Sequence, residues 1–215
     1  MYLVLAYNYN IFLTLLNIYL RRYSNDIIKI ELLNMNLYLM KLAIFISTFI
    51  NTFDKDIYLD FLNKSKQNEE ISNVLSFNIF DYLNSGFISI LDKDYLMIYH
   101  HIISSLLFYL IKLNDYHHIT LLTILLFQLT SPYMSLARIF RQLNKKKMSL
   151  ISFGLFGITF FICRIVYFTY LIYQCLFNEY YNTHKYYYLN TFLFLIYSLQ
   201  IYWMKKIIKI YLLNK

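Results

Sequence analysis

The sequence contains very few residues that interrupt helices. It has three glycines and one proline in 215 residues. Without a glycine-rich run it lacks the loop that cradles a nucleotide phosphate in many enzymes. A chain with so few glycines and prolines suits long continuous helices, whose peptide groups are hydrogen-bonded internally. The scarcity of both residues predicts an all-α protein without a soluble nucleotide cofactor.

Cysteine is equally scarce, and its placement argues against two common roles. Cys163 and Cys175 lie in or near one apolar segment without a CxxC spacing, so we expect neither a disulfide nor a metal ligand. The pairs His100-His101 and His117-His118 are separated by a stretch typical of a loop at a membrane surface. Because that separation does not suit a shared coordination sphere, the sequence predicts no bound metal.

Apolar residues are abundant in the chain. Hydrophobic residues make up 59% of the sequence and aromatic residues 20%, charged residues only 15%, and the mean hydropathy is +0.45. These values are typical of a membrane protein. We expect a polytopic helical bundle with about seven transmembrane helices, the first retained as a span. The segments able to cross about 30 Å of hydrocarbon are residues 2–20, 37–53, 73–91, 95–112, 119–137, 149–177 and 187–204.

The basic residues between these segments predict the orientation, because cytoplasmic loops retain lysine and arginine. Basic residues follow the first, third, fifth and seventh segments, whereas the loop at 54–70 mixes both signs. We therefore expect the N-terminus to be lumenal and the C-terminus cytoplasmic. This distribution explains the net charge of +8 without a soluble basic face, so nucleic-acid binding is not expected. The residues concerned are Arg21, Arg22, Lys29, Lys93, Arg138, Arg141, Lys145, Lys146, Lys147, Lys205, Lys206 and Lys209.

Ionisable residues also occur inside the apolar segments, namely Asp81, His100, His101 and Arg164. A charge at the bilayer centre costs roughly 3 kcal/mol, so such residues usually face a bundle interior and mark a site. Neighbouring helical residues point about 100° apart, so one histidine is expected to face inward. It could serve as a general base oriented by Asp81, or the set could form a buried structural network. Arg164 could neutralise Asp81 or bind a lipid phosphate.

These residues stand in runs that resemble the TLC domain family, which includes the ceramide synthases. The resemblance covers roughly residues 31–210, with residues 1–30 as an N-terminal span and basic loop and 211–215 as a short cytoplasmic tail. It rests on Asp81, on Asp94 shortly before His100-His101, and on the runs Gln128-Leu129-Thr130-Ser131-Pro132, Phe160-Phe161-Ile162-Cys163-Arg164 and Trp203-Met204-Lys205.

The chain departs from two patterns within that family. The less characterised subgroup that it is most similar to typically has Glu-Leu-Ser-Ser-Pro where this chain has the run beginning at Gln128. The amide of Gln128 can still form hydrogen bonds, but this position then offers no carboxylate. The ceramide synthases carry further His and Asp residues that residues 119–137 lack. Acyl transfer to a sphingoid amine is therefore not implied.

The resemblance implies an endoplasmic-reticulum membrane protein with six helices around a lipid-accessible cavity and a role in lipid metabolism or homeostasis. Its partners would be membrane lipids, in a homo- or hetero-oligomer. Two functions stay open. In the first, a lipid or acyl chain is bound without a cofactor, and its contacts are Arg164, Gln128, Thr130, Ser131 and Asp94. In the second, the protein is a membrane acyltransferase or lipid-modifying enzyme supplied with acyl-CoA, and its catalytic residues are His100, His101 and Asp81.

Glycosylation tests the predicted orientation. An acceptor site inserted at the N-terminus should be modified, because that end is expected in the lumen, and so should one inserted in the loop at 54–70. A site placed after Lys209 is the matched control and should stay unmodified. The readout is a mass shift that an endoglycosidase reverses. Modification of neither insertion would contradict the orientation.

Overall fold

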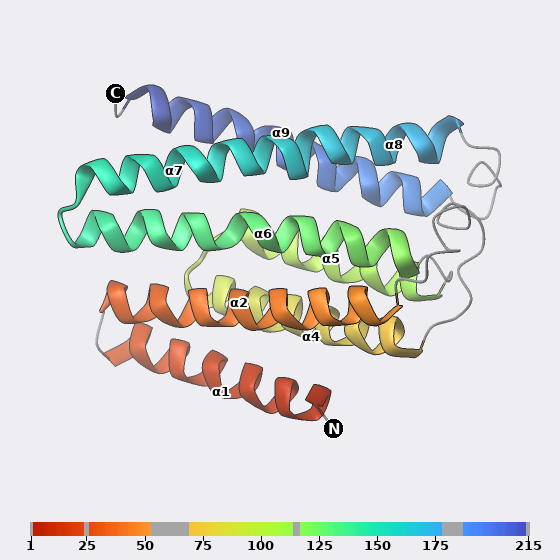
Figure 1. The fold of residues 1–215 in the computed structure, drawn as a ribbon, viewed down its shortest axis with the longest axis horizontal. Helices are drawn as coiled ribbons and strands as arrows, with labels where there is room; N and C mark the ends of the chain where they lie inside the picture. Colours follow the sequence, from red (N-terminus) through yellow and green to blue (C-terminus); the bar gives the residue numbers. More distant parts are fainter. Residues whose placement is uncertain (1, 24–25, 53–68, 114–116, 178–186, 214–215) are drawn as a thin grey trace. The chain divides into compact units, whose positions relative to one another are not determined.

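The structure is a computed structural model that describes residues 2–23, 26–52, 69–113, 117–177 and 187–213. Every element within these ranges is helical, which confirms the predicted all-α fold. In chain order they are α1 (Tyr2–Tyr23), α2 (Ile27–Thr52), α4 (Glu69–Leu91), α5 (Tyr95–Leu113), α6 (His117–Gln142), α7 (Lys146–Phe160), the π-helix η1 (Phe161–Val166), α8 (Tyr167–Phe177) and α9 (Tyr187–Leu213) (Figure 1).

Several of these helices are long and apolar enough to cross a membrane. Among the described residues three candidates meet both criteria: Ile27–Thr48, Ile71–Leu91 and Lys146–Tyr173. Helix α5 holds a shorter apolar stretch, Tyr95–Leu110. The other predicted spans also coincide with helices, namely α1, α6 and α9. The chain is therefore a polytopic helical membrane protein, as its composition predicts.

Two tight turns create antiparallel neighbours along the chain. Two residues after the end of α4 and of α6 stands a residue with a left-handed backbone, Lys93 at φ 55° and Asn144 at φ 57°. The amide after each turns back to a carbonyl of the last helical turn: Asp94 to Ser89 at 3.0 Å, and Lys145 to Phe140 at 2.8 Å. This Schellman arrangement satisfies the end of the helix within very few residues. Helix α5 therefore runs back along α4, and α7 along α6.

The chain groups into two compact units. Unit 1 consists of Met1–Ala43, Leu126–Tyr167 and Gln200–Lys215, and unit 2 of Ile44–Leu125 and Phe168–Leu199. Each unit has its own buried apolar residues. Phe156, Phe160 and Ile207 form a core cluster in unit 1, and the fully buried side chains of unit 2 include Phe45, Ile71, Val74, Leu75 and Phe77.

Helix α2 starts earlier than the sequence predicts. It begins at Ile27, whereas the second apolar segment was expected at 37–53. Glu31 and Asn34 lie before that segment, and an unpaired polar group is costly in an apolar environment. In the structure both side chains are hydrogen-bonded to other helices of unit 1. Partners distant in sequence therefore accommodate these two polar residues in the first turns of α2.

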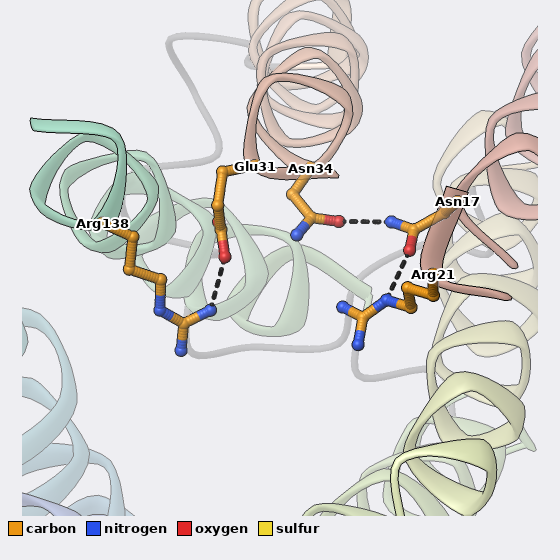
Figure 2. A network of polar contacts seen from close by, with 5 residues as sticks. All are labelled: Asn17, Arg21, Glu31, Asn34 and Arg138. Atoms are coloured by element: carbon orange, nitrogen blue, oxygen red, sulfur yellow. Dashed lines mark hydrogen bonds and ion pairs between the residues drawn. The ribbon is translucent and has the colours of Figure 1, made fainter. Parts of the chain in front are cut away.

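These partners are shown in Figure 2. Nη1 of Arg138 on α6 donates to Oε1 of Glu31 at 2.8 Å, and Nδ2 of Asn17 on α1 donates to Oδ1 of Asn34 at 2.7 Å. Nε of Arg21 in turn donates to Oδ1 of Asn17 at 2.6 Å. Residues on α1 and α6 thus hold α2 in unit 1 through polar contacts. Asn17, a polar residue within the first predicted span, is buried and hydrogen-bonded to both Asn34 and Arg21.

The Glu31–Arg138 pair should contribute measurably to stability. Arg138→Met would leave the carboxylate of Glu31, whose side chain is only 5% exposed, without this donor. Because Arg138 is itself half-exposed, we expect a loss of about 1–3 kcal/mol, seen as a lower Tm in detergent. Arg141→Met, at an exposed position of the same helix, is the control. The double variant Glu31→Leu/Arg138→Met should recover most of the loss, and equal Tm values for the two single variants would contradict the assignment.

Candidate functional site

The α4–α5 hairpin of unit 2 carries the histidine pair. His100 is buried and His101 partly buried, as the angle between neighbouring helical residues requires. Both rings pack against Tyr82 on α4, with ring centroids 5.9 Å and 5.5 Å away. Nδ1 of His100 lies 3.4 Å from Oγ of Ser104, one helical turn further along α5. The pair is thus fixed by an aromatic ring and a hydroxyl.

A glycine allows this close packing. A Cβ at Gly86 on α4 would come within 3.3 Å of Cβ of His101. That atom is the rigid base of a side chain, so it cannot move aside without moving α5. Gly86 therefore sets the distance between the two helices at the level of the histidines.

Asp81 lies on the same hairpin and is only 3% exposed. It is surrounded along α4 by other buried polar side chains. One turn earlier, Asn78 is completely buried, and neither Oδ1 nor Nδ2 has a hydrogen-bond partner among the described residues. Nearer the start of α4, Oγ of Ser76 accepts a hydrogen bond from Nζ of Lys112 at 2.6 Å. The hairpin therefore carries polar groups among its buried apolar side chains.

Arg164 occupies an unusual segment of unit 1. It lies in the π-helix η1, between α7 and α8, and single π-helical turns within α-helices are frequent at functional sites. Its Nη2 donates to the carbonyl oxygen of Phe127 at 2.9 Å. The guanidinium also lies over two aromatic rings, 5.0 Å from the centroid of Phe127 and 5.1 Å from that of Phe160. Cation–π contacts of this kind stabilise a charge away from water.

The run containing Pro132 lies beside Arg164. Helix α6 continues through Pro132, which cannot donate to the carbonyl four residues earlier. Thr130 is completely buried and its Oγ1 donates to the carbonyl of Phe127 at 2.9 Å, so that carbonyl accepts from two side chains. Gln128 is buried and Ser131 half-buried. Within unit 1, Arg164 and Thr130 of this run thus meet at the carbonyl of Phe127.

Asp94 has a local role in the structure. It is exposed and stands just before α5, where Oδ1 accepts from the backbone N–H of Met97 at 3.2 Å, a typical N-cap. Asp26 caps α2 in the same way, through the N–H of Lys29. That hydrogen bond and the adjacent Lys29 ammonium lower the pKa of Asp26 below its ordinary value. Both acids secure helix starts.

Several buried polar residues were missed from the sequence. Lys41 is 2% exposed with its ammonium 5.3 Å from the ring centroid of Tyr38, and Asn78 and Gln200 are fully buried. Glu31, described above, is a fourth. Each stands as an isolated polar residue in an apolar helix, which was the only available signal. In a chain this rich in asparagine and lysine that signal is weak.

Comparison with known families identifies the fold. A family model described as TLC domain, of the TRAM, LAG1 and CLN8 type, matches residues 1–209. The chain belongs to the TLC domain family. The match includes the α4–α5 hairpin, the run at Gln128 and η1. No curated protein matches the chain.

Family membership and apolar helices together establish the general character of the molecule. It is an integral membrane TLC domain protein with a lipid-related role. Its candidate site residues divide between the two units: Asp81, Asp94, His100 and His101 belong to unit 2, and Gln128, Thr130, Ser131 and Arg164 to unit 1. Each group is held by contacts within its own unit.

The role of Gly86 can be tested with a matched glycine in this TLC domain. Replacing a helical glycine by alanine normally stabilises a helix by about 1 kcal/mol. Gly154→Ala should do so, because its Cβ would stand at an ordinary 3.8 Å from Tyr211. Gly86→Ala should gain nothing or lose stability, since His101 is too close. Thermal unfolding in detergent measures both, and an equal rise in Tm would contradict the packing argument.

Proposed function

We propose that this TLC domain protein binds a lipid or acyl chain through the polar interior of its transmembrane helices and so takes part in lipid metabolism or homeostasis. The observation that carries the proposal is the burial of Asp81 and His100 on the α4–α5 hairpin, within apolar segments. Ionisable groups there are expensive to retain. A binding function explains their retention, because a polar lipid group needs polar partners once it leaves the headgroup layer.

Arg164 supports the same proposal independently. A guanidinium within the candidate span Lys146–Tyr173 would be unfavourable without partners, and it is held by a carbonyl and two rings. Its planar fork suits the oxygens of a phosphate or carboxylate. Gln128, Thr130 and Ser131 would add uncharged hydrogen-bonding groups to the contact. Asp94 is proposed to lie nearer the membrane surface.

An enzymatic function is the second candidate, and one contact favours it. The hydroxyl of Ser104 lies within hydrogen-bond distance of Nδ1 of His100, which would select one tautomer of the imidazole. His100 would then be the general base, with His101 and Asp81 as positioning groups and acyl-CoA as acyl donor. The amide at Gln128 offers no second carboxylate for such chemistry, so we rank this function below binding.

We also propose an endoplasmic-reticulum location, with the N-terminus lumenal and the C-terminus cytoplasmic. The orientation is supported by the placement of basic residues at helix ends. Arg21 and Arg22 lie in the last turn of α1, and Lys145 and Lys146 stand where α7 begins. These ends would face the anionic cytoplasmic leaflet.

Lipid analysis separates the two functions. The protein and its His100→Ala/His101→Ala variant are purified in detergent, the co-purifying lipids are identified by mass spectrometry, and whole-membrane lipids of the expressing cells are profiled. If the protein binds lipid without catalysis, we expect the variant to retain about tenfold less lipid than the wild type, the equivalent of one hydrogen bond. No product class should disappear from the membranes.

The other outcomes are equally informative. Retained lipid together with a vanished product class would assign catalysis to the histidines. An unchanged bound lipid and an unchanged profile in a folded variant would show that the pair is structural. His184→Ala, which lies outside the described residues, controls for loss of a histidine as such. Absence of any stoichiometric lipid from the wild type would contradict the binding proposal itself.

A further inference from the structure

Three helical segments of unit 1 meet in one apolar cluster. Its buried members are Phe156, Phe160 and Ile207. Partly buried side chains from α6, α7 with η1, and α9 pack against it, and they include Tyr133, Met134, Phe153, Ile165, Trp203 and Met204. Residues that adjoin this cluster on the three segments therefore lie near a common level of the unit.

The register between α7 and α9 can be followed along this cluster. A Cβ on Gly154 would touch Tyr211, and one on Gly157 would touch Ile207. The two helices therefore run antiparallel, and successive residues toward the end of α7 face earlier residues of α9. Ile165 and Trp203 pack on the same cluster. Continuing this register places Gln200 on α9 level with the π-helix that carries Arg164.

Polar residues follow the apolar cluster on all three segments. Thr130 lies one turn before Tyr133 on α6, Arg164 one turn after Phe160, and Gln200 one turn before Trp203. Thr130 and Arg164 both donate to the carbonyl of Phe127. Thr130 and Arg164 are thus joined through this carbonyl, and the register places Gln200 near their level in unit 1.

Gln200 differs from the other two residues. It is completely buried, and neither its Oε1 nor its Nε2 has a hydrogen-bond partner among the described residues. Buried side-chain amides are almost always hydrogen-bonded, because a buried donor or acceptor left without a partner is destabilising. In a membrane-spanning bundle the penalty is greater, since lipid tails offer no alternative partner. The amide of Gln200 therefore has hydrogen-bonding capacity that a polar ligand would satisfy.

The chemistry of the amide restricts what that ligand is. A glutamine side chain offers two N–H donors and one carbonyl acceptor. An ester oxygen satisfies only the donors, whereas a hydroxyl or an amide N–H with its neighbouring oxygen satisfies both ends. The positive charge of Arg164 at the same level favours an oxygen on the ligand. The π-helix that carries Arg164 also presents apolar side chains outward: Ile162 and Val166 are 55% and 51% exposed, as side chains in contact with acyl chains would be.

We propose that Gln200 is a lipid-binding residue that hydrogen-bonds the hydroxyl or amide group of a membrane lipid, in a site that it shares with Arg164 and Thr130. This inference rests on the proposed lipid-binding function and names the part of the lipid that is recognised. A lipid whose polar groups are all esters or ethers binds more weakly, because Oε1 of Gln200 then has no donor.

Gln200→Met tests the proposal with two readouts of opposite sign. Methionine has a similar volume and no strong hydrogen-bonding group. In delipidated protein the variant should have a higher Tm than the wild type, because the unsatisfied amide is gone. The same variant should retain about tenfold less co-purifying lipid by mass spectrometry, the loss that corresponds to one hydrogen bond. Gln142→Met, at the exposed end of α6, is the control and should change neither quantity.

The outcomes distinguish this inference from the function on which it rests. If Gln200→Met keeps the wild-type lipid, the amide binds only water or nothing; the inference is then overturned while lipid binding stands. If wild-type protein carries no lipid, the proposed function fails first. A measurement on the wild type covers the case in which the variant does not fold. Dioleoylglycerol should raise the Tm of delipidated protein more than its O-methyl ether does, and equal shifts would overturn the inference.

Discussion

The need to satisfy polar groups inside apolar helices governs this protein. Its helices carry many isolated polar residues, and in hydrocarbon each of them requires a partner from the chain or from a ligand. The Glu31–Arg138 and Asn17–Asn34 contacts meet this need in unit 1 and fix α2 against α6 and α1. The same requirement explains why Arg164 is held by a carbonyl and two rings.

The candidate site residues belong to this same system of buried polar groups. On the α4–α5 hairpin, His100 is fixed by Tyr82 and Ser104, and the close approach of the helices depends on Gly86. Near η1, the carbonyl of Phe127 accepts hydrogen bonds from Thr130 and Arg164. Some of these groups have a hydrogen-bond partner within the chain, as Glu31 has in Arg138. The amide of Gln200 has none among the described residues, and the proposed lipid would supply one.

Binding and catalysis make different demands on these residues. A lipid-binding site needs only complementary donors, acceptors and charge, which Arg164, Thr130 and Gln200 provide within one unit. Catalysis also needs a base whose tautomer is controlled, and the Ser104 contact of His100 is the feature that would serve it. The amide at Gln128 supplies no carboxylate for acid–base chemistry, which makes the simpler demand the better match.

The sequence by itself determined the helical fold, most of the apolar segments, the family and the principal polar residues, because composition and short motifs are local properties. It placed the start of α2 too late, since it could not show that Glu31 has a partner 107 residues away. The π-helix at Arg164, the packing of the histidines on Tyr82 and the unsatisfied amide of Gln200 were decided by tertiary structure alone. Whether a buried polar group is satisfied depends on side chains from other helices, and only folding brings those together.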